Sequence, residues 1–142
     1  MAFVDALKYL VIKVGTVLEG YMKGQPNTRI LSVSYDELLL RMRHMIFQNE
    51  GYDVVSAYGL ESSLEQCKKG GFHLFVLGHS IPSDDKRKMV EAFRRACPAP
   101  IISLQRGASE PWVDEADYHV DPDPEPLLRV VAEVSQKQVA AA

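Results

Sequence analysis

The chain has 142 residues, 46% of them hydrophobic and 25% charged, which is typical of one globular domain with a single core. A net charge of −3 leaves no positive excess for a phosphate backbone, so no direct nucleic-acid partner is expected. No apolar run approaches the roughly 18 residues of a membrane helix, and Asp5, Lys8 and Lys13 interrupt the hydrophobic N-terminus. Cys67 and Cys97 form no metal-binding motif. We therefore expect a cytoplasmic protein without a membrane span, metal or cofactor.

Residues 1–28 are expected to form an amphipathic helix followed by a connector. Apolar residues recur at alternating intervals of four and three, like the a and d positions of a heptad. They are Phe3, Leu7, Leu10, Val14, Val17 and Tyr21. Gly24 and Pro26 end the helix. Such a stripe must be buried, so we expect an association face that packs on its own domain or forms a homodimer.

From residue 29 to residue 138 the chain alternates short apolar runs with helical patterns, which indicates βαβ units. Strands are predicted at 29–33, 52–57, 73–77, 101–104 and 117–120. Helices are predicted from residue 34 to about 50, at 60–69, at 86–96, around 110–115 and from about 122 onward, with a frayed tail at 139–142. This order predicts an α/β, flavodoxin-like fold. Its doubly wound, five-stranded parallel sheet has the order 2-1-3-4-5, with the N-terminal helix added.

Two of these helices carry specific expectations. Ser34 and Glu37 have the Ser-x-x-Glu spacing of a capping box, so the first helix of this domain is predicted to start at Ser34. Its buried face is predicted to consist of Leu38, Leu39, Met42, Met45 and Ile46. The helix at 86–96 is predicted to present a solvated basic face made of Lys86, Arg87, Lys88, Arg94 and Arg95.

Several short segments, in order, resemble the receiver domains of two-component response regulators. Residues 30–33 with Leu38-Leu39 resemble the first strand and helix of that family, and residues 50–57 (EGYDVVSA) its second strand. Residues 71–77 followed by Pro82 resemble the third strand and its loop. Residues 100–104 and 116–122 resemble the fourth and fifth strands. The resemblance covers residues 29 to about 135.

The resemblance also implies that the phosphorylation pocket of this family is degenerate here. In the family, an acidic pair and a phosphoacceptor aspartate bind Mg²⁺, and a hydroxyl and a lysine bind the phosphoryl oxygens. The acidic pair falls on Ser34 and Tyr35, with Asp36 just beyond. The acceptor falls on Gly78, the hydroxyl on Gln105 and the lysine on Asp121, while the switch aromatic remains as Tyr118.

We therefore expect a pseudo-receiver that is not an enzyme and that acts through protein partners of a signalling pathway or through self-association. One alternative is a small serine hydrolase that uses the turn Gly78-His79-Ser80, with Asp117 and His119 as partners of the serine. Another is a receiver-like domain that binds a small molecule in the emptied pocket, lined by Gln105 and Tyr118.

Overall fold

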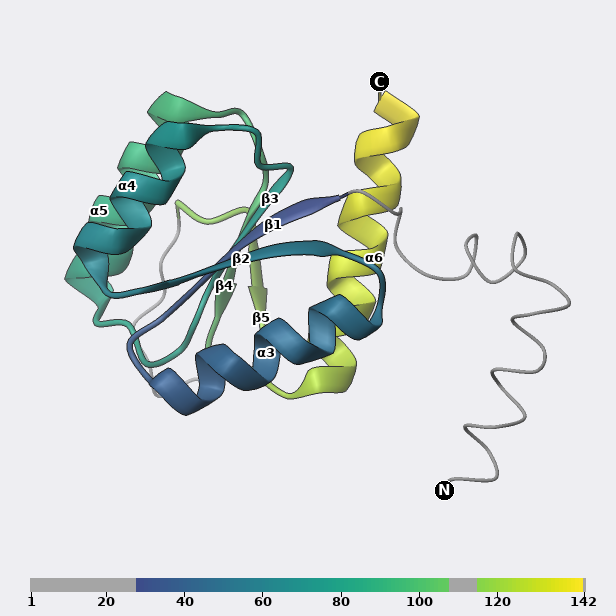
Figure 1. The fold of residues 1–142 in the computed structure, drawn as a ribbon, viewed down its shortest axis with the longest axis horizontal. Coiled ribbons are helices and arrows are strands. Elements are labelled where there is room, and N and C mark those ends of the chain that lie inside the picture. The colour runs from purple at the N-terminus through teal and green to yellow at the C-terminus, as the bar shows by residue number, and fades with distance from the viewer. Residues whose placement is uncertain (1–27, 108–114, 142) are drawn as a thin grey trace, which may run out of the picture.

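The computed structural model describes residues 28–107 and 115–141. Within these ranges five parallel strands form one sheet in the order β2-β1-β3-β4-β5 (Figure 1). The strands are β1 (Arg29–Ser34), β2 (Asp53–Tyr58), β3 (Leu74–Leu77), β4 (Ile101–Leu104) and β5 (Tyr118–Val120). The predicted fold class and strand order are confirmed. The expected N-terminal helix and most of the helix expected at 110–115 lie outside the described residues.

Helices cover both faces of the sheet (Figure 1). They are α3 (Glu37–Asn49), α4 (Leu60–Lys69), α5 (Ser83–Ala96) and α6 (Pro124–Ala141). The helix α6 continues through Ala141, past the point where a frayed tail was expected. No helix of the described residues is long and apolar enough to span a bilayer.

Two apolar clusters hold these layers together. On the face covered by α4 and α5, Phe75 of β3 stacks on Phe93 of α5, with ring centroids 4.4 Å apart. On the face covered by α3 and α6, Phe47 and Val131 pack against Leu74 of β3. Because β3 is buried along its whole length, it contributes to both clusters, as expected of a central parallel strand.

The N-terminus of α3 differs from the predicted capping box. The cap is Asp36, whose side chain accepts a hydrogen bond from the backbone N–H of Leu39, and the helix begins at Glu37. The hydroxyl of Ser34 instead accepts from the backbone N–H of Asp36 and donates to its carbonyl oxygen. Ser34 therefore shapes the turn before the helix, and the prediction that it caps the helix is wrong.

The predicted buried face of α3 is wrong for three of its five residues. Leu38, Met42 and Met45 are exposed, whereas Leu39 and Ile46 are partly buried. The fully buried residues of the helix are Leu40, Arg43 and Phe47. Both sets have helical spacing, but the second includes an arginine, whose guanidinium group lies at the carboxyl edge of the sheet.

Replacing Asp36 with alanine should lower the free energy of unfolding by about 1 kcal/mol, because a helix N–H would lose its acceptor. Asp36→Ser should retain most of the stability. Chemical denaturation of the two variants and the parent measures the difference. A loss in Glu37→Ala equal to that in Asp36→Ala would contradict the cap assignment and point to a general loss of negative charge at the helix start.

Candidate functional site at the carboxyl edge of the sheet

The residues singled out from the sequence gather where the parallel strands end. Val33 of β1 is aligned with Leu77 of β3, and Leu77 with Ser103 of β4. The residue after β3, Gly78, donates its N–H to the carbonyl oxygen of Val33 at 2.8 Å. The residue after β4, Gln105, donates its N–H to the carbonyl oxygen of Val120 at 2.9 Å. In open α/β sheets this edge is where ligands bind.

Two serines join the loop after β1 to the loop after β3. The Oγ atoms of Ser34 and Ser80 are 3.1 Å apart, within hydrogen-bond distance. Ser80 Oγ also accepts from the backbone N–H of Tyr35 at 3.0 Å. Hydroxyl groups thus bridge the loops that follow β1 and β3. Sequence analysis did not anticipate that Ser80 would have this bridging role.

Tyr35 extends the same network to the start of α5. Its hydroxyl donates to Asp85 Oδ2 at 2.7 Å. Partial burial, and then the hydrogen bond and the negative charge of Asp85, raise the pKa of Tyr35. The phenol therefore stays protonated and acts as a donor, and Asp85 is engaged as its acceptor.

The position of the family's acceptor, Gly78, faces the guanidinium group of Arg43. A Cβ atom added at Gly78 would lie 2.9 Å from Arg43 Nη1 and 3.0 Å from the carbonyl oxygen of Val33. Both distances are shorter than ordinary van der Waals contacts. A side chain at position 78 would therefore be crowded by the Arg43 guanidinium, which could shift, and by the backbone carbonyl oxygen of Val33, which could not shift easily.

Arg43 is buried and only partly satisfied by hydrogen bonds. Its Nη2 lies 3.2 Å from His79 Nδ1, and Nη1 has no hydrogen-bond partner among the described residues. Arginine can only donate, so His79 Nδ1 must accept. Burial lowers the pKa of Arg43, as does the charge of Arg106, and Asp36 partly opposes this effect. The site therefore holds a partly desolvated positive charge.

A second cation, Lys86, is buried near this edge. Its Nζ donates to Ser103 Oγ at 3.0 Å and to the carbonyl oxygen of Leu104 at 2.7 Å. The prediction that Lys86 belongs to a solvated basic face is wrong, because its long side chain reaches from the first turn of α5 to the end of β4. Neither Arg43 nor Lys86 was recognised from the sequence as part of the site.

The remaining predicted residues are spread along β5 and the turn after it. Asp121 is exposed, and its Oδ1 accepts from the backbone N–H of Asp123 at 3.0 Å, which shapes the turn into α6. Tyr118 packs against the apolar cluster beneath α6. It is aligned through Ile102 with Val76, two residues before Gly78. The structure therefore brings Ser34, Tyr35, Gly78 and Gln105 to the edge and places Tyr118 below it.

The donor set at this edge does not fit Mg²⁺. The described residues contain no group of three or more Asp, Glu, His or Cys side chains that could hold a metal. Asp36 caps α3 and Asp85 accepts from Tyr35. Mg²⁺ requires oxygen ligands in near-octahedral geometry, and a buried guanidinium group in the site would repel it.

The hydrolase alternative finds no support in the contacts of Ser80. A serine nucleophile needs a base that takes its proton. The hydroxyl oxygen of Ser80 accepts from the Tyr35 amide and lies against Ser34 Oγ, so it helps to hold two loops together. The neighbouring His79 contacts Arg43 through Nδ1.

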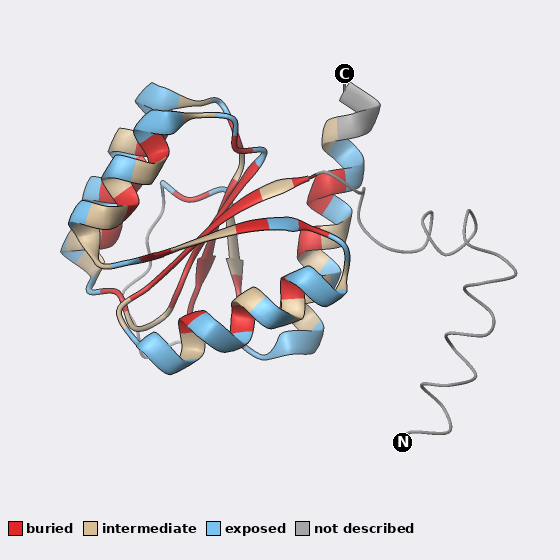
Figure 2. Cartoon of the chain, viewed as in Figure 1, coloured by how far each residue is buried: buried red, intermediate tan, exposed pale blue. Residues whose placement is uncertain are grey.

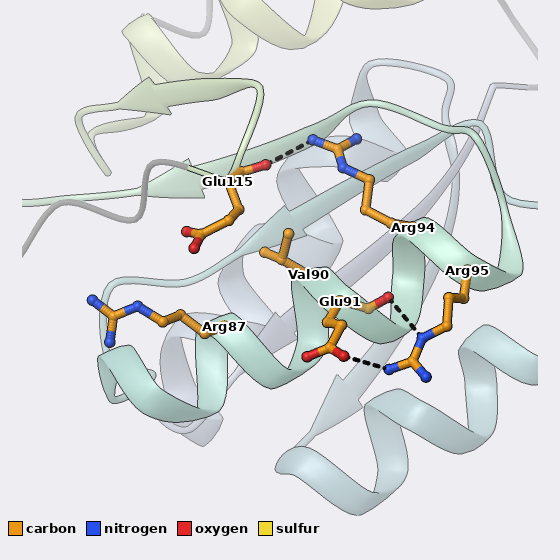
Figure 3. Close-up of a pocket in the computed structure, with 6 residues that line it drawn as sticks. All are labelled: Arg87, Val90, Glu91, Arg94, Arg95 and Glu115. Atoms are coloured by element: carbon orange, nitrogen blue, oxygen red, sulfur yellow. Dashed lines mark hydrogen bonds and ion pairs between the residues drawn. The ribbon is translucent and has the colours of Figure 1, made fainter.

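A shallow hollow of about 680 Å³ lies on the outer side of α5 (Figure 3). Its charged lining is largely paired. Arg94 binds the Asp117 carboxylate and the carbonyl oxygen of Glu115, and Arg95 binds Glu91. Exposed pairs of this kind are weak and solvated. Apart from Lys86, the face thus matches the solvated surface that was predicted, and we assign it no ligand.

Gly78→Ala should lower the free energy of unfolding by about 1–3 kcal/mol, because the new methyl group would overlap Arg43 and Val33. Arg43→Met removes the charged end of the side chain, so adding Gly78→Ala in that background should cost less. Equilibrium denaturation of the two single variants and the double variant forms a double-mutant cycle. Additive losses would show that the two positions are independent.

Comparison with solved structures identifies the fold of this domain. The CheY-like response regulator receiver domain protein of Methanospirillum hungatei JF-1 is 20% identical, with a TM-score of 0.71, covering 82% of this chain and 99% of its own. The chemotaxis response regulator CheY4 of Vibrio cholerae is 22% identical, with a TM-score of 0.67, covering 76% of this chain and 98% of its own.

A third similar structure is a complex. It is the co-crystal structure of the Saccharomyces cerevisiae histidine phosphotransfer protein Ypd1 with the receiver domain of the response regulator Ssk1. The matched chain is 13% identical, with a TM-score of 0.66, covering 80% of this chain and 92% of its own. No protein-family model and no curated protein matches the chain. At these identities the comparisons show the fold, which is that of CheY-like response-regulator receiver domains.

Proposed function

We propose that this chain is a non-catalytic receiver-like module that works without phosphorylation and acts through contacts with other proteins. The observation that carries the proposal is the crowding at Gly78, where an added Cβ would lie 2.9 Å from Arg43 Nη1 and 3.0 Å from the carbonyl oxygen of Val33. The receiver fold supports a role in signalling.

Phosphoryl transfer to a carboxylate needs three parts in one place. These are the nucleophile, a metal that neutralises the negative charge of the phosphoryl group, and groups that bind its oxygens. At this edge Gly78 supplies no nucleophile. Asp36 and Asp85 are engaged in hydrogen bonds, and Asp121 lies exposed in the turn before α6. The basic side chains of Arg43 and Lys86 are buried at this edge, and the hydrogen bonds of Lys86 to Ser103 and Leu104 support a fixed conformation that needs no added phosphoryl group.

We further propose that the partners are proteins of a signalling pathway in the cytoplasm, with a second copy of the chain among the candidates. A similar receiver domain was solved in complex with a phosphotransfer protein, which supports protein contact as the mode of action. The loops after β1 and β3, which Ser34 and Ser80 join, would then present one stable surface to a partner.

The proposal predicts that the protein will not gain 80 Da after incubation with acetyl phosphate and Mg²⁺. Gly78→Asp should not gain it either, because the new carboxylate would meet Arg43 before any metal. Intact-mass spectrometry measures both, with a phosphorylatable receiver domain as the positive control.

An 80 Da adduct on the parent protein would overturn the proposal. An adduct on Gly78→Asp alone would show that Arg43 does not block the site. An adduct that appears only when Gly78→Asp is combined with Arg43→Met would support the blocking role of Arg43. Thermal unfolding with and without the phosphodonor provides a second readout, and the midpoint should not change.

A further inference from the structure

The exposed large apolar side chains of the described residues gather mainly on α3. Leu38 is 63% exposed, Met42 is 48% exposed and Met45 is 59% exposed, and Tyr58 lies at the end of the neighbouring strand β2. The outer side of α3 is exposed to solvent (Figure 2). We call Leu38, Met42 and Met45 the α3 apolar face. Their spacing of four and three residues places them on one side of the helix, and exposed apolar residues gathered on one face can form a contact surface.

The other described helices present charged residues at their exposed positions. These include Glu61, Glu65 and Lys68 on α4, Arg87, Lys88 and Glu91 on α5, and Arg129, Glu133 and Lys137 on α6. The α3 apolar face is therefore a local feature, and it requires a local explanation.

The spacing of this face matches that of the N-terminal stripe. Leu38, Met42 and Met45 are separated by four and then three residues, and so are Leu10, Val14 and Val17 in the sequence. Helices whose apolar residues alternate at intervals of four and three pack side by side with interlocking side chains. The chain thus carries a second stripe with the pattern that the α3 apolar face would accept.

The chain enters the domain beside the end of α3. The carbonyl oxygen of Thr28 accepts from the N–H of Asp53 at the start of β2, and the carbonyl oxygen of Phe47 near the end of α3 accepts from the N–H of Tyr52. Residues 24–28 can span up to about 17 Å when extended. The helix α3 has 13 residues and is about 20 Å long, so a connector that starts beside its end can reach most positions along it. A helix in residues 1–23 could therefore lie along α3 of the same chain.

We propose that the N-terminal stripe, with Leu10, Val14 and Val17 at its centre, covers the α3 apolar face of its own chain. The contact gives the stripe a specific place of burial and removes Leu38, Met42 and Met45 from water. It deepens the proposed role of the stripe in association, but it does not depend on the absence of phosphorylation. A failure here would leave the acetyl phosphate result unaffected.

Methionine oxidation by hydrogen peroxide tests the contact in the full chain. Met42 and Met45 should oxidise slowly, close to the rate of Met89, which is fully buried in the core. In Val14→Glu/Val17→Glu the charged stripe should leave α3, and Met42 and Met45 should oxidise about fivefold faster or more, because oxidation follows exposure of the sulfur. Thr16→Glu, on the opposite face of the predicted helix, should keep the slow rates. Peptide mass spectrometry reads each methionine separately.

Each other outcome has a defined meaning. The proposal would be overturned if Met42 and Met45 oxidise fast in the parent chain and equally fast in Val14→Glu/Val17→Glu. Protection that disappears on dilution would also overturn it, because the face would then be covered by a second copy.

Fast oxidation of Met89 would show that the Val14→Glu/Val17→Glu variant is unfolded. A disulfide cross-linking test with Val17→Cys/Met42→Cys would then take the place of that variant. That pair should form a disulfide within one chain, whereas Val17→Cys/Lys88→Cys should not, and equal disulfide yields from both pairs would overturn the proposal.

Discussion

The burial of Arg43 is the constraint on which the carboxyl edge depends. A guanidinium group withdrawn from water loses solvation, and only part of that loss is recovered through His79 and the nearby charge of Asp36. The helix α3 nevertheless buries Arg43 together with Leu40 and Phe47, so the packing of the helix fixes the position of the arginine. The guanidinium group then fills the space beyond Gly78. The fold is that of CheY-like receiver domains, and in this chain a buried guanidinium group lies at the carboxyl edge of the sheet.

The other polar groups at the edge are linked by hydrogen bonds. Lys86 Nζ donates to the Ser103 hydroxyl and to the carbonyl oxygen of Leu104. Ser34 and Ser80 bridge two loops with hydroxyl groups. Tyr35 keeps its proton and donates a hydrogen bond to Asp85. A buried polar network stabilises one conformation when its members find partners, and most members of this one do.

The sequence was sufficient to predict the sheet, because each strand is a short apolar run bounded by turn residues, and β4 (Ile101–Leu104) was predicted to the residue. It also singled out Gly78, which the structure places at the carboxyl edge of the sheet. It failed on α3, where Leu38, Met42 and Met45 compete with Leu40 and Phe47 for the core. Leu40 and Phe47 are seven residues apart and lie on one side of the helix, but the arginine between them interrupts the apolar pattern, so the buried face was not recognised. Lys86 could not be predicted, because a lysine in a basic run gives no signal of burial.

The backbone at Gly78 has a further consequence. Five other glycines of the described residues have positive φ angles, among them Gly51 at 90°, but Gly78 is not one of them. The φ angle at position 78 therefore does not demand glycine. A side chain there is restricted by the Arg43 guanidinium and by the backbone carbonyl oxygen of Val33, and only the first restriction is relieved when residue 43 becomes shorter. Among relatives of this protein, positions 43 and 78 should therefore covary: a larger residue at 78 should accompany a small or apolar residue at 43.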